Sequence, residues 1–347
     1  MINETIRVRC SILSSSSAIV SGKCLWRPTQ AQIDNAEVTN FASFVQAKTQ
    51  FDWGQDFQAL WRWSVDHMPE FWDLLWDWHG IIGDIGGRIL ESGEKMPRAK
   101  FFPDARINFA ENLLADADEQ LAITAHGEDG RVTRLTRAEL KQQVLELAGW
   151  LQDHGVTAGD RVAAYTPNSV EAVITMLATA SLGAVFSSCS PDFGLQGVCD
   201  RFGQIEPKIL VGCDGYHYAG KAIDRMDVLA ALAQKLPTVD TVLVIGYLSA
   251  QPDCSRLPNA MLFDQAVANA TAITQFRQMP FNAPLYILYS SGTTGAPKCI
   301  VHGIGGTLIQ HIKEHRLHTN VKPGDRFFYF TTCGWMMWNW LVSGLAS

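Results

Sequence analysis

A ten-residue stretch, YSSGTTGAPK at residues 289–298, brings together side chains that suit the binding of phosphate groups. Gly292 and Gly295 permit backbone conformations that aim several N–H groups at one point. Four hydroxyl groups add further donors, from Ser290, Ser291, Thr293 and Thr294. Lys298 adds a positive charge that can reach phosphate oxygens. A helix expected over about 306–315 could contribute the positive end of its dipole.

Two simpler interpretations and two better-known phosphate motifs fit this stretch poorly. A flexible linker or plain turn is disfavoured because the apolar run PLYILY at 284–289 leads directly into it. The Walker A pattern fails because Pro297 precedes the lysine and Cys299 follows it. The segment GIGGTL at 303–308 is not a dinucleotide fingerprint, since Leu308 stands where the third glycine belongs.

A second motif, HIKEH at residues 311–315, points to a different chemistry. It matches the H-x-x-E-H pattern of inverted zinc proteases, in which His311 and His315 would bind zinc and Glu314 would act as base. The alternative is a polar, solvated helix face in a histidine-rich stretch. Short motifs of this kind match often by chance, so zinc hydrolysis is kept only as a remote alternative.

The elements around these motifs alternate between strand and helix from about residue 121. Strands are expected at 160–165, 185–189, 208–212, 241–247 and 284–289. Helices are expected at 139–155, 169–184, 221–235 and 306–315. This order predicts an α/β fold with mostly parallel sheets flanked by helices. Ligands of such sheets bind beyond the carboxyl ends of the strands, which is where the 289–298 stretch would lie.

The N-terminal third has a different character, with six tryptophans between Trp53 and Trp78. Pro69 suits the first turn of a helix. One face of that helix would carry Phe71, Leu74, Leu75 and Trp78. Such an aromatic cluster could bind sugars or bases, but packing is the favoured interpretation because tryptophan buries so much area.

Composition narrows the classes of function. The 347 residues are 47% hydrophobic and 18% charged, as in an ordinary globular protein, and the net charge of −7 argues against non-specific nucleic-acid binding. The eight cysteines show no C-x-x-C spacing, which favours reduced thiols in a cytoplasmic protein over disulfides or a zinc ribbon. No apolar run reaches the ~18 residues of a membrane span. Residues 1–24 are serine-rich and poor in acidic residues, and a disordered extension is favoured over a targeting segment.

With these residues in view, the chain resembles the adenylate-forming enzymes, a family that includes acyl-CoA synthetases, luciferases and peptide-synthetase adenylation domains. YSSGTTGAPK fits every position of their phosphate-loop pattern. The resemblance extends over about 25–347: FDWGQDFQALWRWSV and FFPDARINFAENLL are similar to the N-terminal region of the acetyl- and acetoacetyl-CoA synthetase branch. The segment VKPGDRFFYFTTCGWMMWNWLVSGLA is similar to the part that lines the acyl pocket, and most closely to that of the acetoacetate ligases.

The resemblance implies a two-step ligation of acetoacetate to CoA. ATP and a carboxylate first give an acyl-adenylate and pyrophosphate, and the CoA thiol then displaces AMP. Lys298, Thr293 and Thr294 would act on the departing phosphates together with Mg²⁺, and the rest of the 290–295 run would bind ATP. Arg201 aligns loosely with an arginine that contacts a CoA phosphate, although a surface ion pair is an equal alternative.

The acyl pocket would be shaped by three residues of the GWMM segment. Trp335 would lie at the pocket and the CoA tunnel, while Met336 and Met337 would shape the pocket itself; ordinary core packing is the alternative for all three. His302 follows the loop and could lie near the nucleotide, or could be a buried, hydrogen-bonded histidine. No protein-held metal site and no membrane or nucleic-acid partner is expected.

The expected organisation is a disordered extension over 1–24, a helical, tryptophan-rich region over 25–115 and a partial AMP-binding domain over 116–347. The apolar end of the sequence suggests a piece of a longer protein that lacks the family's C-terminal domain. On this interpretation the piece would not complete adenylation by itself. Two further alternatives stay open: a ligase for acetate or propionate, and a non-catalytic nucleotide-binding remnant.

Overall fold

The computed structural model describes residues 25–257, 259–290, 295 and 297–347. The chain divides into two compact units, one that ends at Trp78 and one that runs from His79 to Ser347. The extension predicted for residues 1–24 lies outside the described residues.

The first unit is helical and its aromatic side chains pack on one another. Its helices are α1 (Gln30–Asp34), α2 (Glu37–Lys48), α3 (Phe57–Asp66) and α4 (Met68–His79). The predicted helix around Pro69 is thus confirmed as α4, with Phe71 and Leu75 buried. The ring of Phe71 meets Phe41 edge-on at 5.6 Å and Trp63 at 6.5 Å between centroids. These contacts are those of a packed aromatic core, as the favoured interpretation expected.

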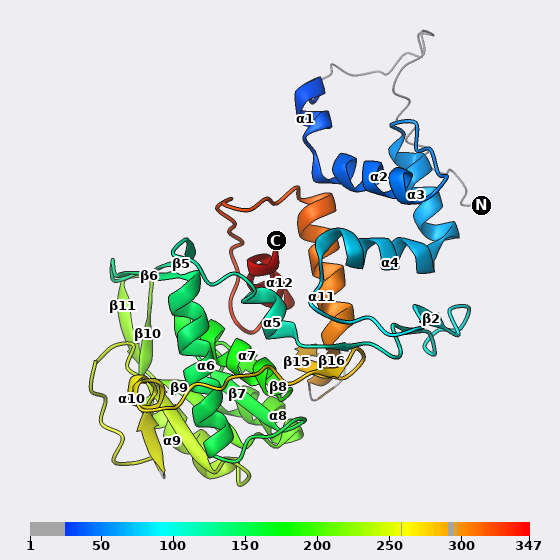
Figure 1. The fold of residues 1–347 in the computed structure, drawn as a ribbon. Helices are drawn as coiled ribbons and strands as arrows, with labels where there is room; N and C mark the ends of the chain where they lie inside the picture. The colour runs from blue at the N-terminus through cyan, green and yellow to red at the C-terminus, as the bar shows by residue number, and fades with distance from the viewer. Residues whose placement is uncertain (1–24, 258, 291–294, 296) are drawn as a thin grey trace, which may run out of the picture. The chain divides into compact units, whose positions relative to one another are not determined.

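The second unit is built on a seven-stranded sheet in the order β13-β12-β9-β7-β8-β15-β16 (Figure 1). Neighbouring strands run parallel from β13 to β15, and β16 alone runs antiparallel to β15. The strands are β7 (Arg161–Tyr165), β8 (Val185–Cys189), β9 (Ile209–Cys213), β12 (Thr241–Ile245), β13 (Ala260–Leu262), β15 (Pro284–Ser290) and β16 (Lys298–Gly303). The predicted α/β fold with a mostly parallel sheet is therefore confirmed.

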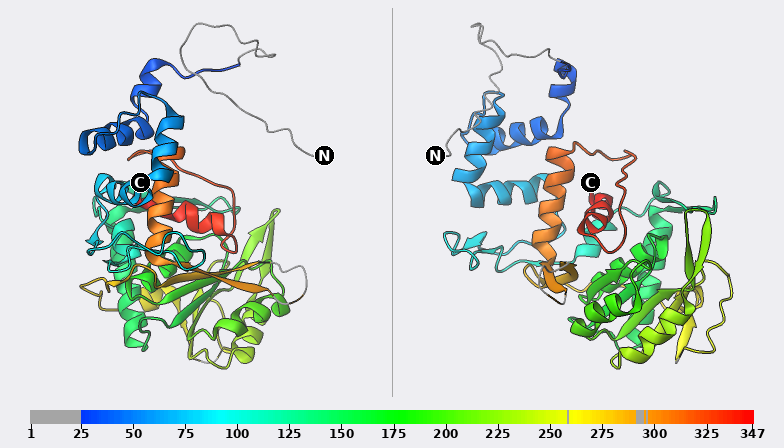
Figure 2. Two further views of the ribbon diagram at one scale, coloured as in Figure 1. Left: turned by 90° about the vertical axis from the view of Figure 1, so that its right-hand side faces the viewer. Right: turned by 180° about the vertical axis from the view of Figure 1, so that it is seen from behind.

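Helices cover both faces of this sheet, as the further views in Figure 2 also show. One face packs on α8 (Leu195–Ile205) and α9 (Met226–Lys235), with Val198, Phe202 and Leu229 fully buried between helix and sheet. The opposite side carries α6 (Arg137–Asp153), α7 (Val170–Ser181) and α10 (Phe263–Ala268). The apolar face of α6, which includes Leu140, Val144 and Leu147, is buried, and the helix ends at Asp153, two residues before the predicted end.

The second unit also contains short strands and helices outside the seven-stranded sheet. β1 (Gly83–Asp84), β4 (Arg106–Ile107) and β14 (Met279–Pro280) form a three-stranded sheet. Three two-stranded sheets pair β2 (Leu90–Glu91) with β3 (Lys100–Phe101), β5 (Leu121–His126) with β6 (Val132–Thr136), and β10 (Gly215–Tyr218) with β11 (Lys221–Asp224). The remaining helices are α5 (Phe109–Leu113), α11 (Ile304–Lys313), a π-helical turn (Glu314–His318), α12 (Met336–Ser343) and a 3₁₀ turn (Gly344–Ala346).

Two predicted helices are placed differently by the structure. The helix expected over 221–235 begins only at Met226, because residues 221–224 form β11. Ala219 and Gly220 both have positive φ angles, and this conformation makes the two-residue turn that closes the β10–β11 hairpin.

The helix expected over 306–315 is α11, and β16 separates it from the phosphate loop. Six strand residues extend over about 20 Å at ~3.3 Å each. The N-terminus of α11 is therefore at the far end of β16, and its dipole cannot serve the loop, contrary to the prediction.

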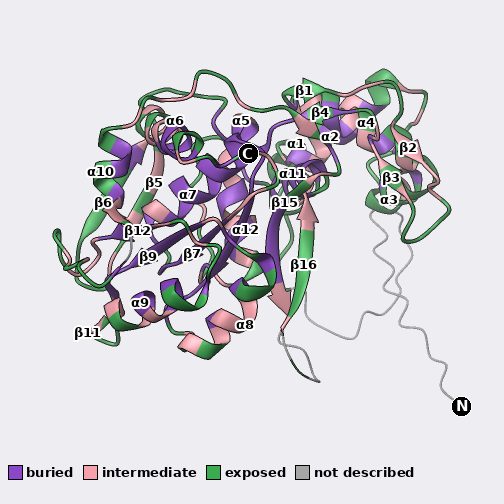
Figure 3. Cartoon of the chain, turned by 90° about the horizontal axis from the view of Figure 1, so that it is seen from below, coloured by how far each residue is buried: buried purple, intermediate pink, exposed green. Residues whose placement is uncertain are grey.

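Burial falls off toward the β16 edge of the sheet (Figure 3). β7 and β9 are buried almost throughout, whereas the first four residues of β16 are exposed. In the described part of the chain no helix is long and apolar enough to cross a membrane. The six cysteines there are all free thiols.

Candidate functional site

The predicted phosphate loop connects two hydrogen-bonded strands at the carboxyl edge of the sheet. Ser290 ends β15 and Lys298 begins β16, and the two residues are paired across the hairpin. Gly295 has a φ of 145°, which favours glycine. The predictions for Ser291, Gly292, Thr293 and Thr294 fall outside the described residues. Because β15 runs parallel to β8, the loop emerges at the edge where the parallel strands end.

The strand that leads into the loop is held by a buried serine of β8. The Ser187 hydroxyl lies 2.8 Å from the carbonyl oxygen of Ile287 and 2.9 Å from the phenol oxygen of Tyr289. Burial raises the pKa of Tyr289, while its hydrogen bond to Ser187 acts in the opposite direction. Tyr289 therefore stays a neutral phenol one residue before the end of β15, where the loop begins.

Arg201 lies on α8 beside this same strand. Its guanidinium lies 4.5 Å from the ring centroid of Phe193 and 5.8 Å from that of Tyr289. One guanidinium nitrogen donates to the carbonyl oxygen of Gly197 at 2.6 Å. No salt bridge of Arg201 is present among the described residues, so the ion-pair alternative finds no partner there. The structure thus places a half-buried cation next to Tyr289 and the start of the loop.

The predicted acyl-pocket segment crosses the same edge of the sheet. The Ser188 hydroxyl donates to the carbonyl oxygen of Cys333 at 2.6 Å, and the indole N–H of Trp338 donates to the Asn168 amide oxygen at 2.8 Å. A side chain at Gly334 would contact the backbone of Ser190, just after β8. These contacts bring residues 333–338 to the end of β8, next to β15.

Trp335, Met336 and Met337 stand at the start of α12, with Trp335 as its N-cap. Trp335 is 64% exposed and Met336 is 41% exposed, whereas Trp338, one turn further on, is fully buried. Neither Trp335 nor Met336 fills the core, so both side chains are free to contact a ligand.

His302 sits on β16, and its ring lies 5.0 Å from the ring of Tyr286 on β15. It is half-buried, and desolvation lowers its pKa, which keeps the imidazole neutral near pH 7. His302 is four residues after Lys298 along the strand, so it lies away from the loop, at the α11 end of β16.

The zinc motif does not assemble a metal site. The Nδ1 atom of His311 bonds to the Ser343 hydroxyl at 2.8 Å, and His315 packs on Trp340 at 4.5 Å between ring centroids. Glu314 accepts from Gln310 and pairs with Lys313. Burial lowers the pKa of His311 to about 3 and that of His315 to about 4. Across 25–257, 259–290, 295 and 297–347, no group of three potential metal ligands lies together, so the geometry does not favour zinc hydrolysis.

Comparison with known proteins identifies the family. A family model described as AMP-binding enzyme matches residues 113–346. The chain belongs to the AMP-binding enzyme family. Its match covers the seven-stranded sheet, the loop strands and the segment that starts α12, so the clustered site residues all lie inside the AMP-binding region.

Several relatives of this AMP-binding chain are acetoacetyl-CoA synthetases. It is 46% identical over 322 residues to an acetoacetyl-coenzyme A synthetase of Rhizobium meliloti, a match covering 93% of this chain and 49% of that protein. It is 40% identical over 350 residues to an acetoacetyl-CoA synthetase of Danio rerio, covering 96% of this chain and 51% of that protein. The solved acetoacetyl-CoA synthetase of Streptomyces lividans is similar with a TM-score of 0.88 at 41% identity, over 94% of this chain and 50% of that one. The chain therefore spans about half the length of the relatives it matches.

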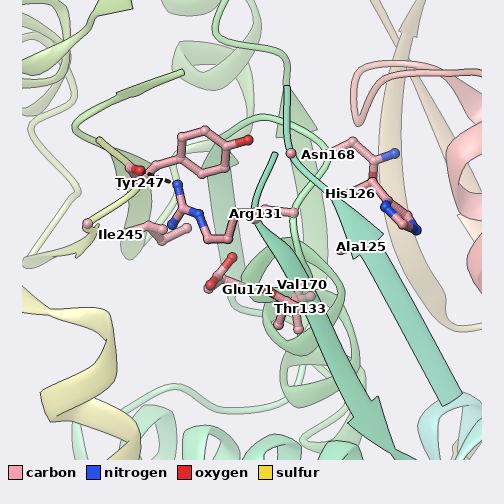
Figure 4. A pocket seen from close by; sticks show the side chains of 12 residues that line it. Ala125, His126, Arg131, Thr133, Asn168, Val170, Glu171, Ile245 and Tyr247 are labelled. Atoms are coloured by element: carbon pink, nitrogen blue, oxygen red, sulfur yellow. Dashed lines mark hydrogen bonds between the residues drawn. The ribbon is translucent and has the colours of Figure 1, made fainter. Parts of the chain in front are cut away.

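Two cavities in the AMP-binding chain lie apart from the loop. The first is a narrow space of about 50 Å³ between the β5–β6 hairpin, the N-terminus of α7 and the end of β12 (Figure 4). Arg131 reaches across it, donates to the carbonyl oxygen of Tyr247 at 2.8 Å and lies 5.0 Å from the Tyr247 ring centroid. The second measures about 270 Å³ and is lined by Asn112, Arg137, Arg316 and residues 345–347 among others. Neither is lined by Ser290, Lys298, Arg201 or Trp335.

A buried carboxylate shapes the chain turn beside the first cavity. Both oxygens of Asp214 accept backbone N–H groups: Oδ1 from Tyr247 at 2.8 Å and Leu248 at 2.9 Å, and Oδ2 from Ser249 at 2.8 Å. Asp214 follows β9 and is only 4% exposed. Its three charge-assisted bonds fix the turn after β12.

Sequence reasoning missed the side chains that hold the site together. Ser188, Asn168 and Gln204 belong to no motif. Ser188 lies near the carboxyl end of β8 and Asn168 follows β7, whereas Gln204 lies in the last turn of α8. The one usable signal was position: TPNS at 166–169 comes directly after an apolar strand, where ligand-proximal residues gather.

Proposed function

We propose that this chain supplies the phosphate-binding and acyl-binding parts of an ATP-dependent acetoacetate–CoA ligase. One observation carries the proposal: the loop of the β15–β16 hairpin, Arg201 and the Gly334–Met337 segment all come to the same stretch of the sheet's carboxyl edge. That edge is where parallel α/β sheets bind their ligands. The names of the relatives support the choice of acyl group.

The first step would join acetoacetate to ATP. A carboxylate oxygen attacks the α-phosphorus, the bond to the bridging oxygen breaks, and pyrophosphate leaves with the electron pair. Negative charge therefore builds on the departing phosphates. Lys298 and Ser290, with Ser291, Thr293 and Thr294 between them, would neutralise that charge through donors set in place by the hairpin.

Mg²⁺ would enter with ATP as part of the substrate. On this proposal the nucleotide phosphates would be its main ligands.

The second step would transfer the acyl group to CoA. The thiolate of CoA attacks the carbonyl carbon of the acyl-adenylate, and AMP leaves with its oxygen. Arg201, stacked between Phe193 and Tyr289, would bind a phosphate of CoA. Trp335, exposed at the N-cap of α12, would border both the acyl pocket and the path of the CoA thiol. A cytoplasmic location is part of this proposal, and the free thiols agree with it.

Acetoacetate, acetate and propionate are distinguished by a substrate comparison. Pyrophosphate release is measured with each acid, using a longer protein that contains this chain and has the full length of the relatives. The proposal expects acetoacetate to give the highest kcat/KM, with Met336→Trp reducing it by narrowing the pocket. Equal or greater efficiency with acetate or propionate would assign the chain to another short-chain ligase. MgATP binding without any acid-dependent pyrophosphate release would indicate a nucleotide-binding remnant instead.

A further inference from the structure

One side chain of α8, Gln204, contacts the chain on both sides of Lys298. Its amide nitrogen donates to the carbonyl oxygen of Pro297 at 2.8 Å. Its amide oxygen lies 3.6 Å from the Cys299 sulfur, which donates to it. The two bonds span more than ninety positions of sequence and meet at the start of β16.

The orientation of this amide follows from the chemistry of its neighbours. The nitrogen of Gln204 also donates to the Asp200 carbonyl oxygen at 2.6 Å. Both carbonyl oxygens can only accept, so the NH₂ group must face them and the amide oxygen must face the thiol. Each N–H of Gln204 thus has a partner, one within α8 and one on Pro297. The amide therefore connects the backbone of α8 to the backbone just before Lys298.

The pairing of β15 with β16 shows which side chains at the start of β16 face α8 and which face away from it. Cys299 pairs with Tyr289, and both side chains face α8, where Arg201 stacks on Tyr289. Lys298 pairs with Ser290, and because side chains alternate along a strand, both point to the opposite face. α8 therefore contacts β15, before the loop, through Arg201, and the start of β16, after the loop, through Gln204.

We propose that Gln204 is a positioning residue for Lys298, holding the lysine where it meets the phosphates of ATP. The proposal rests on the proposed role of Lys298 in ATP binding. Gln204 touches neither the nucleotide nor the reacting atoms; it restricts the backbone on either side of the lysine. Preorganising a cation in this way increases its effect on developing charge, because no rearrangement is needed when ATP binds.

Three variants separate the anchoring bonds. Gln204→Met keeps the length of the side chain and removes every hydrogen bond. Gln204→Glu keeps an acceptor for the Cys299 thiol but sets an oxygen against the Pro297 carbonyl. Cys299→Ser retains a donor toward Gln204 and serves as the conservative variant. Gln196→Met is the matched control, because Gln196 is also exposed on α8 and, among the residues that the structure describes, bonds to Asp200 of its own helix alone.

The first readout needs no ligand. Hydrogen–deuterium exchange of the peptide covering residues 298–303 should speed up about 2- to 10-fold in Gln204→Met and Gln204→Glu, the effect of losing one exposed hydrogen bond. Gln196→Met and Cys299→Ser should exchange like the wild-type protein. Unchanged exchange in both Gln204 variants would overturn the anchoring.

The second readout is equilibrium binding of MgATP, with Lys298→Ala as the reference for complete loss of the lysine. Gln204→Met should weaken MgATP binding about 2- to 10-fold, less than Lys298→Ala does, while Gln196→Met leaves it unchanged. If Lys298→Ala weakens binding and Gln204→Met does not, the positioning role is refuted and the proposed function stands. If Lys298→Ala has no effect, the proposed role of Lys298 fails, and with it the positioning role, whatever the exchange data show about the anchoring itself.

Discussion

Two adjacent serines on β8 hold different parts of the site, and replacing each in turn should separate them. Ser187 and Ser188 are both 1% exposed, but their side chains face opposite sides of the sheet. Ser187 bonds to Ile287 and Tyr289 on the strand that leads into the phosphate loop. Ser188 bonds to the carbonyl oxygen of Cys333, two residues before Trp335.

The expected size of the effect follows from burial. Ser188→Ala leaves the Cys333 carbonyl without this donor, and an unsatisfied buried polar group costs about 1–3 kcal/mol. Ser187→Ala removes one bond to a carbonyl and one to a phenol that burial keeps neutral, so its cost should fall in the same range of about 1–3 kcal/mol. Global stability therefore does not distinguish the two variants, and the test has to be local.

Hydrogen exchange and tryptophan fluorescence provide that local test. Ser188→Ala should speed amide exchange over residues 333–338 and shift the emission of the protein, because Trp335 loses its fixed backbone. Exchange at 286–290 should stay as in the wild-type protein. Ser187→Ala should give the reverse pattern. If both variants loosened both segments equally, or neither, the view that separate serines hold the loop and the acyl segment would be wrong.

Three other predictions follow from buried groups. Because desolvation lowers the pKa of His315 to about 4, the folded state binds fewer protons than the unfolded state between about pH 6.5 and 4, and stability falls as the pH drops through that window. Denaturant unfolding at pH 7 and pH 5 should show the wild-type protein losing about 2 kcal/mol more than His315→Phe; equal losses would contradict the burial argument. Asp214→Ala should lower the free energy of unfolding by about 3 kcal/mol, because the turn loses three hydrogen bonds to the carboxylate. Asp214→Asn should lower it by less, since the amide keeps one acceptor oxygen. No loss of stability in either variant would show that these bonds do not stabilise the turn. Gly305→Ala would place a methyl group in steric conflict with the Phe281 ring and should destabilise the fold by about 1–3 kcal/mol. Gly306→Ala, whose methyl group would meet no atom within 4 Å, should stabilise the fold by about 0.5–1 kcal/mol. Thermal unfolding that ranks the two variants the other way would refute this packing.

The sheet was predictable because its strands are buried. Runs such as RVAAY at 161–165 and TVLVI at 241–245 are buried and largely apolar after their first residue, as strands covered on both faces must be. β16 was missed for the opposite reason: its KCIVHG residues lie at an exposed edge and carry neither a continuous apolar run nor a clean alternation. Missing it led to the wrong expectation that a helix terminus follows the phosphate loop. β11 was missed likewise, because it is exposed and polar and reads as the first turn of α9.

The site was only partly predictable, for a related physical reason. The hydroxyls, glycines and lysine of residues 290–298 form a local pattern, so their chemistry can be read from sequence alone. The contacts that hold them join segments far apart in the chain, as when Ser188 bonds to Cys333 or Gln204 to Pro297. A single sequence carries no signal for such pairs, because serine and glutamine occur at many exposed and buried positions without this role.

Affinity labelling of lysines tests the central claim most directly. An ATP analogue that carries an aldehyde on its terminal phosphate forms an imine with a lysine near the phosphate site, and borohydride reduction makes the link permanent. Peptide mass spectrometry then identifies the lysine. The account predicts labelling of Lys298 that MgATP prevents, and little protected labelling at Lys208 or Lys235. Protected labelling of another lysine, with Lys298 left unmodified, would contradict the assignment of the 290–298 loop to the phosphates of ATP.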